Sequence, residues 1–123
     1  MRPSLFGLAL VWLLAVAPIA SARIAPEFFR TVVRAHLHEI QACYAEGLAR
    51  RPALAGRVVL QWTIAESGEV IDAGVQSSEL GDPLVELCMV ARVRGWTFPA
   101  NGRGTVRVSY PFELRPFELR PSD

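Results

Sequence analysis

The stretch GRVVLQWTIAESGEVIDAGVQS, residues 56 to 77, decides the fold of this 123-residue chain. Apolar and polar side chains alternate from Arg57 to Ala65, which is typical of a half-buried strand. One face of this strand carries Val58, Leu60, Trp62 and Ile64. The polar turn at 66–69 contains Gly68, and the strand pattern resumes from Val70 to Ser77. The stretch therefore predicts an antiparallel hairpin.

A long amphipathic segment precedes the hairpin. Apolar side chains recur at helical spacing over residues 26–50, which predicts one helix. Pro26 and Glu27 suit its first turn. Arg51-Pro52 ends the helix, because a residue before proline avoids helical geometry. The apolar arc of this helix holds Phe29, Val32, Val33, Ile40, Cys43, Tyr44 and Leu48.

A second helix and a third strand follow the hairpin. Asp82-Pro83 supplies an N-cap and a first-turn proline, and Gly95 is the expected stop. Cys88 lies in the apolar majority of this helix, beside Leu84, Leu87 and Ala91. Alternation returns from Val106 to Leu114 and predicts the third strand. The order helix, strand, strand, helix, strand predicts an α+β domain with two helices on one face of a three-stranded sheet.

The first 22 residues predict an export signal. Arg2 precedes an apolar run from Leu5 to Ile19, and Ala20-Ser21-Ala22 supplies small residues for cleavage. The run is shorter than the roughly 20 apolar residues of a spanning helix, so we expect cleavage, with an uncleaved anchor as the alternative. Cleavage removes one of the 13 arginines, so the remaining 12 arginines balance the 12 acidic residues. We therefore expect a periplasmic or secreted protein without a basic field for nucleic acid and without a remaining membrane span.

The C-terminus carries a tandem repeat, PFELR at 111–115 and again at 116–120. Its five-residue period would turn the apolar side chains of the second copy to the opposite face of a continuous strand. Pro116 also removes a ladder donor. We therefore expect the domain to span residues 23–115 and residues 116–123 to form a disordered or loosely docked tail.

The two cysteines, Cys43 and Cys88, lie on the apolar sides of the two predicted helices. Oxidising compartments preserve disulfides, so export predicts a structural disulfide between them. Two separate buried thiols and a redox-active pair are the alternatives. The redox-active pair is disfavoured, because the chain lacks the Cys-x-x-Cys spacing that lowers a thiol pKa.

The sequence predicts no catalytic residue, metal site or cofactor. His36 and His38 are two residues apart on a helix and point about 200° away from each other, so they cannot chelate one metal. We expect His36 to pack in the core. The serines lack a nucleophile-elbow context, and Glu66 and Glu69 lie in a turn. Four aromatic side chains are assigned to the core rather than to ligand stacking: Trp62, Trp96, Phe98 and Tyr110.

These residues resemble a known family. GRVVLQWTIAESGEV at 56–70, the helix at 85–93 and the exit RGWTFP at 94–99 are similar to the TonB C-terminal domain, over roughly residues 34–114. The ACY element at 42–44 and the ELC element at 86–88 resemble more closely the C-terminal domain of the gliding-motility proteins AgmX and PglI. The resemblance implies an antiparallel sheet with the first strand central and the third strand at an edge.

The family resemblance also implies a binding mode. In TonB-like domains the third-strand edge receives a short extended segment of an outer-membrane partner by strand addition. Carried onto this sequence, the partner-binding residues are Thr105, Arg107 and Ser109. TonB-like edges also pair with each other, so a homodimer is a further expectation. Only residues 23–27 separate the signal from the first helix, without a Pro-rich spacer, so we expect passive binding rather than force transmission.

Two functional hypotheses follow. The first is a non-enzymatic, exported cell-envelope domain that binds a protein segment by edge-strand addition. The second is an accessory domain that binds peptidoglycan or another envelope glycan through an arginine-bearing helix face. That face would comprise Arg30, Arg34, Arg50 and Arg51.

Overall fold

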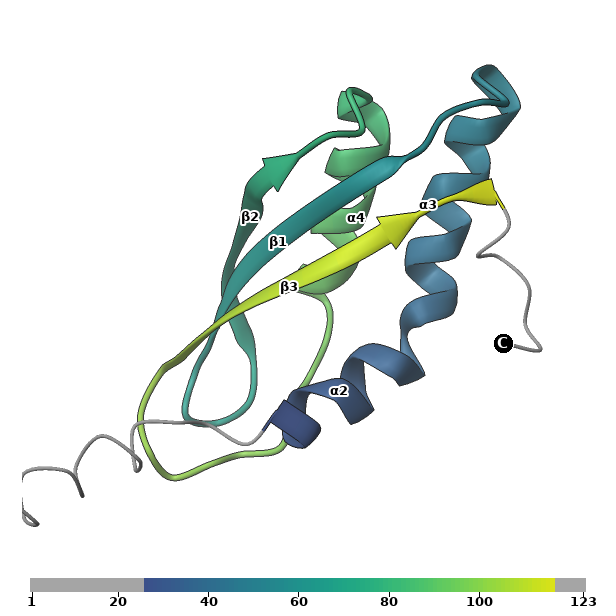
Figure 1. The fold of residues 1–123 in the computed structure, drawn as a ribbon. Helices are drawn as coiled ribbons and strands as arrows, with labels where there is room; N and C mark the ends of the chain where they lie inside the picture. Colours follow the sequence, from purple (N-terminus) through teal and green to yellow (C-terminus); the bar gives the residue numbers. More distant parts are fainter. Residues whose placement is uncertain (1–25, 117–123) are drawn as a thin grey trace, which may run out of the picture.

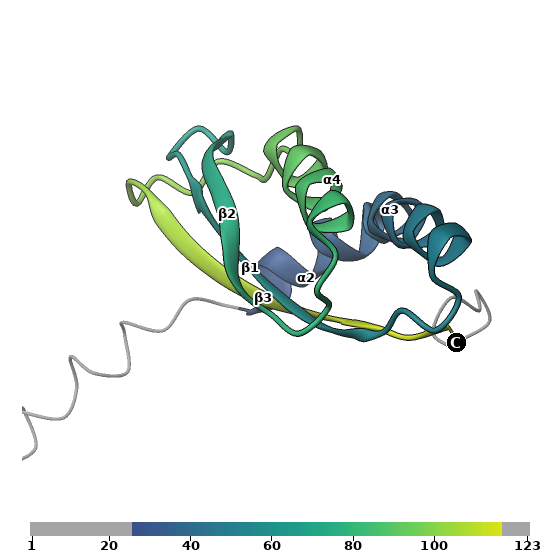
Figure 2. The ribbon, with the colours of Figure 1, turned by 90° about the horizontal axis from the view of Figure 1, so that it is seen from above.

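The structure is a computed structural model that describes residues 26–116. Its elements follow in the order α2 (Pro26–Ala35), α3 (Leu37–Arg50), β1 (Gly56–Ile64), β2 (Val70–Ser78), α4 (Pro83–Arg94) and β3 (Val106–Leu114). The helices lie on one face of the three-stranded sheet (Figure 1), and Figure 2 shows the other face bare. The predicted α+β fold class is confirmed. The expected signal peptide and residues 117–123 of the expected tail lie outside the described residues.

The sheet is antiparallel with the strand order β2-β1-β3, so β1 is central and β3 forms an edge. The pairing of β1 with β3 is regular, running from Gly56 opposite Leu114 to Ile64 opposite Val106 without a shift. The pairing of β1 with β2 is interrupted by two register shifts. The two edges of the sheet therefore differ in regularity.

The core lies between the sheet and the helices. The four helix-facing side chains of β1 from Val58 to Ile64 are at most 1% exposed. Trp62 occupies the centre, with three aromatic rings at centroid distances of 5.9–6.4 Å: Trp96, Phe98 and Tyr110. Trp96 and Phe98 are each 2% exposed, whereas Tyr110 is half-buried at the margin of the core. Because Trp96 and Phe98 follow α4, they hold the end of that helix against the sheet.

The prediction of one helix over residues 26–50 is wrong at His36, where α2 ends before α3 begins. His36 has a φ of −108° and a ψ of 7°, outside helical geometry. Its ring stacks on Trp96 with centroids 5.0 Å apart, and its Nδ1 lies 3.0 Å from an oxygen of Glu39. His36 is half-buried at this break. The segment predicted as one helix therefore forms α2 and α3, so that three helices rather than two lie over the sheet in residues 26–116.

The apolar majority of α4 does not all face the core. Val85, Met89, Val90 and Val93 are buried. Leu84 and Leu87 are 62% and 65% exposed. A helix that is apolar on most sides does not specify its rotation by pattern alone, and packing on β1 and β2 selected this one. Within residues 26–116 no helix has the length and apolarity needed to cross a membrane.

A disulfide joins Cys43 of α3 to Cys88 of α4, with the two Cα atoms 5.7 Å apart. The helices run in opposite directions, since Arg50 near the end of α3 binds Asp82 at the start of α4. The disulfide therefore ties together two elements separated by 45 residues in the sequence.

The turn between β1 and β2 depends on Gly68. Its φ of +108° lies in a region that other residues avoid. Its N–H donates to Ala65 and its carbonyl accepts from the N–H of Phe98, both at 2.8 Å. A Cβ at this position would overlap the carbonyl oxygen of Phe98. The turn and the segment after α4 are therefore packed backbone against backbone.

We predict that Gly68→Ala lowers the free energy of unfolding by at least about 2 kcal/mol, from the unfavourable φ and the backbone overlap. Urea unfolding measures the loss. Gly74→Ala in β2 is the matched control, because no atom lies within 4 Å of the added Cβ. We expect that variant to stay within about 0.5 kcal/mol of the wild type. Equal stability of the two variants would contradict the packing of this turn.

We predict that the double variant Cys43→Ala, Cys88→Ala loses about 4 kcal/mol of stability. The loss follows from the entropy that a loop closure of 45 residues removes from the unfolded chain. Denaturant midpoints of the variant and of the oxidised and reduced wild type measure it. Reduced wild type should match the variant, and an unchanged midpoint on reduction would show that the bond does not stabilise the fold.

Candidate partner-binding edge

The side chains predicted to mark the binding edge lie on and beside β3. Thr105 precedes the strand by one residue, and Arg107 and Ser109 lie within it. All three are exposed, whereas Val106 and Val108 between them are buried. The hydroxyl of Ser109 donates to Gln76 of β2 across the helix-free face, at 2.5 Å. The three side chains therefore line the bare face, and the open backbone of β3 runs beside them.

Pro111 indicates which backbone groups of β3 face outward. Proline is tolerated in an edge strand where its nitrogen points away from the ladder. Outward and inward groups alternate along an antiparallel strand. Arg107 and Ser109 have the same parity as Pro111, so their N–H groups face the open edge. An added strand can pair with the segment before Pro111 and loses a donor at Pro111 itself.

A groove borders β3 on its helical side. Two cavities of about 220 Å³ each form it, and they share Tyr110 and Pro111. The cavity between α3 and β3 is lined by Leu37, Ile40, Gln41, Tyr44 and residues 110–115. The cavity between α2 and β3 is lined by Phe29, Arg30 and residues 108–111. The groove therefore follows β3 and is walled by the helices opposite it.

The groove suits the side chains of a peptide. Each cavity is smaller than the roughly 300–1,000 Å³ of small-molecule sites. The hydroxyl of Tyr44 donates to the carbonyl of Leu54, which fixes its ring in the groove wall, and burial raises the pKa of that phenol. An added strand places every second side chain on the helical side. Apolar side chains at that spacing would meet the apolar lining.

The opposite edge of the sheet, β2, is less open to an added strand. Two register shifts interrupt its pairing with β1, and such bulges blunt an edge. The guanidinium of Arg94 also donates to the carbonyl of Ala73 in β2, at 3.4 Å. Regular pairing and the adjoining groove thus favour β3 as the site.

A hydrogen-bonded cluster at the start of α3 holds the helices beside the groove. One oxygen of Glu39 accepts from the indole N–H of Trp96 at 2.9 Å, and the other lies 3.0 Å from His36. The bond from Trp96, followed by that to His36, lowers the pKa of the Glu39 carboxyl. Glu39 therefore links the helix break to the segment that follows α4.

The four arginines of the second hypothesis do not form one surface. Arg50 binds both oxygens of Asp82 at 3.0 Å, and Arg51 donates to the carbonyl of Gly81 at 3.3 Å. Burial opposes ionisation of Asp82, but the N–H of Val85 and the Arg50 guanidinium outweigh it and hold its pKa below the usual value. Arg30 and Arg34 lie on α2, at the other end of α3, which is about 20 Å long.

The other polar candidates are dispersed. Glu66 and Glu69 are exposed in the hairpin turn. His36 and His38 do not come together with further ligands, and no group of three His, Cys, Asp or Glu side chains within residues 26–116 could hold a metal ion. The assignment of Tyr44 to the buried apolar arc is confirmed, since its side chain is fully buried. The sequence did not indicate the groove beside it, which is also lined by Leu37 and Gln41, because an apolar pattern does not show where a cavity lies.

Comparisons with known proteins found similar structures but no family. No family model matches the chain. No curated protein matches it either. Two solution structures of the TonB C-terminal domain of Helicobacter pylori are similar. The structure of residues 179–285 has 20% identity and a TM-score of 0.45, covering 75% of this chain and 83% of that chain.

The structure of residues 194–285 has 23% identity and a TM-score of 0.42, covering 63% of this chain and 90% of that chain. These likenesses assign neither the family nor the function of this chain. The resemblance of the ACY and ELC elements to AgmX and PglI remains an interpretation of the sequence.

We predict that the Glu39 cluster stabilises the fold above about pH 4.5 and that this contribution is lost on acidification. The folded pKa of Glu39 lies below its ordinary value of 4.5, so the folded state binds its proton less readily than the unfolded state. Stability is therefore present above the unfolded pKa and disappears as pH falls through the folded pKa. Thermal unfolding between about pH 7 and pH 2 measures it.

Glu39→Gln should lower Tm at neutral pH, and its difference from the wild type should shrink toward acidic pH. Glu66→Gln in the exposed turn is the control and should follow the wild-type curve. A Glu39→Gln difference that is independent of pH would contradict the role of the carboxylate charge.

Proposed function

We propose that this chain is a non-enzymatic domain of the cell envelope that binds an extended segment of a partner protein by adding it as a strand to the β3 edge. The observation that carries the proposal is the combination of a regular, open edge with a groove along its helical side. Main-chain hydrogen bonds would supply affinity, and side chains entering the groove would supply selectivity.

The groove and the bare face together define the partner segment. Alternate side chains are apolar, because the accessible apolar lining of the groove comes from Leu37 and Tyr110, which are half-buried. The other side chains of the partner segment would lie on the bare face beside Arg107. This arginine is exposed and has no ion pair within residues 26–116. A carboxylate in the segment beside Arg107 would complete an ion pair.

We place this function in the periplasm or outside the cell. The disulfide between Cys43 and Cys88 is of the kind that oxidising compartments preserve. The export signal predicted for residues 1–22 carries the same expectation. The proposed partner is accordingly an envelope or outer-membrane protein.

Photocrosslinking in cells tests the binding mode. A photoreactive amino acid at position 107 or 109 should give adducts with one protein, identified by mass spectrometry. The same group at position 38, on the exposed side of α3, should not. Ser109→Pro removes an outward N–H while leaving the ladder to β1 intact, so it should abolish adducts from position 107. Ser109→Ala keeps that N–H and should retain them.

Adducts of equal strength from all three positions, or adducts retained after Ser109→Pro, would contradict strand addition.

The glycan hypothesis has its own readout, which is sedimentation of the purified chain with peptidoglycan. Sedimentation that is lost in the Arg30→Ala, Arg34→Ala double variant would favour that hypothesis. These two arginines lie on α2 and take no part in the hydrogen bonds that Arg50 and Arg51 make at the start of α4.

A further inference from the structure

An apolar stripe on α4 faces solvent. Leu84 and Leu87 are 62% and 65% exposed, Ala91 is exposed, and Cys88 is half-buried. These four residues recur at helical spacing and form one line along the helix, here called the α4 stripe. Val75 on the adjoining β2 is 37% exposed and extends the apolar surface. The sheet does not cover this side of α4, since the buried side chains of the helix point the other way.

The α4 stripe is complementary to itself. Its positions are symmetric about the point between Leu87 and Cys88. In an antiparallel pair of α4 helices related by a two-fold axis at that point, Leu84 of one copy opposes Ala91 of the other. A large side chain thus meets a small one, and the two Leu87 side chains meet at the centre. Such self-complementarity is what a symmetric dimer interface requires.

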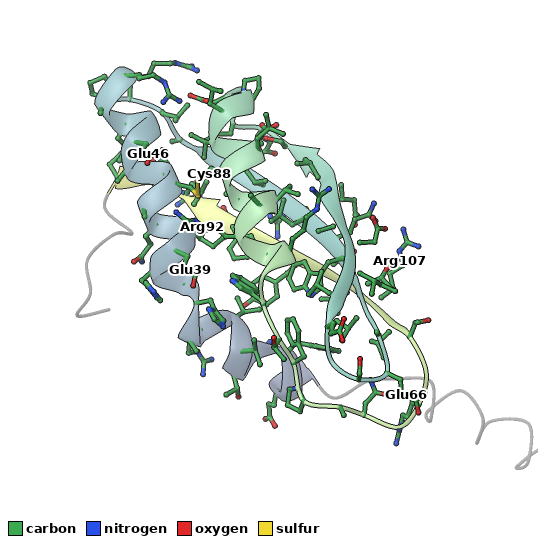
Figure 3. The ribbon with its side chains drawn as sticks, turned by 180° about the vertical axis from the view of Figure 1, so that it is seen from behind. Glu39, Glu46, Glu66, Cys88, Arg92 and Arg107 are labelled. Carbon is green, nitrogen blue, oxygen red and sulfur yellow. A yellow bond between two sulfur atoms is a disulfide. The ribbon has the colours of Figure 1, made fainter. Side chains whose placement is uncertain are left out.

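Two charged side chains flank the stripe with the same symmetry. Because α3 and α4 are antiparallel and joined at Cys43 and Cys88, Glu46 lies one turn from the disulfide toward the start of α4. Arg92 lies one turn from it toward the end of α4. Figure 3 shows Glu46 and Arg92 on opposite sides of Cys88. Both are exposed, and neither forms an ion pair within residues 26–116.

We propose that the α4 stripe, with Glu46 and Arg92, is a docking surface for a second copy of this chain. The two-fold axis through the stripe brings Glu46 of each copy to Arg92 of the other, so the charges complement each other twice. The contact is one helical face per copy, so we expect a weak dimer that forms at high concentration.

This interface goes beyond strand addition and does not use the β3 edge. It is also distinct from the edge-to-edge homodimer that the family resemblance implies. Both β3 edges stay open in the dimer, which would bind two segments of one partner with higher avidity than a single copy.

Sedimentation velocity of the purified, disulfide-bonded chain from about 1 µM to about 1 mM tests the proposal. The wild type should shift from monomer to dimer with concentration. Leu87→Asp places two carboxylates face to face and should abolish the shift. Ile71→Asp is the matched control, because Ile71 is 57% exposed on β2 outside the stripe, and it should dimerise as the wild type does.

A charge exchange tests the geometry. Arg92→Glu or Glu46→Arg should each weaken the dimer by about tenfold, because each creates two repulsive pairs. An equimolar mixture of these two variants should restore dimers, since every pair across the mixed interface is again opposite in charge. Far-UV circular dichroism checks that each variant is folded.

A wild type that stays monomeric throughout, or a mixture that stays monomeric, would overturn the proposal. A dimer that survives Leu87→Asp but is lost in Ser109→Pro would also overturn it and assign dimerisation to the β3 edge.

Discussion

The buried face of β1 is the constraint on which the rest of the structure depends. Its side chains from Val58 to Ile64 are almost fully buried, so a helical layer must cover them. α4 packs on β1 and β2, whereas α3 packs mainly against α4. The disulfide between Cys43 and Cys88 fixes α3 to α4. α3 is thus held beside β3 without filling the space between them, and the groove is what remains.

The two edges of the sheet differ in how well their backbones could accept an added strand. β3 pairs with β1 in one register along its whole length, which keeps its outer backbone groups regularly spaced. β2 lies under α4, carries two register shifts and gives one carbonyl to Arg94. An added strand needs evenly spaced donors and acceptors, so the geometry separates a regular, open edge from a blunted one. Pro111 then limits the usable length of β3.

The two proposed surfaces lie on different elements and can act together. Strand addition uses the outer backbone of β3 and the groove beneath α2 and α3. Self-association uses the outer face of α4, where Leu84 and Leu87 are exposed and Glu46 and Arg92 are unpaired within the described residues. Occupation of one surface leaves the other accessible. Binding of two partner segments by one dimer is therefore compatible with both.

The sequence by itself determined the strands, the turn and the boundaries of α4. Alternation along β1 and β3 follows from one buried face, and the start of α4 at Asp82-Pro83 is local chemistry that needs no tertiary partner. The helix ends before Gly95 as predicted, although Gly95 has a φ of −93° rather than the left-handed conformation of a glycine cap. Only the tertiary structure decided the break at His36, because it depends on stacking with Trp96, 60 residues further along the chain. It also decided the rotation of α4, since a helix that is apolar on most sides packs in several ways. The groove beside β3 depends on both, because the break and the packing of α4 set where α2 and α3 lie.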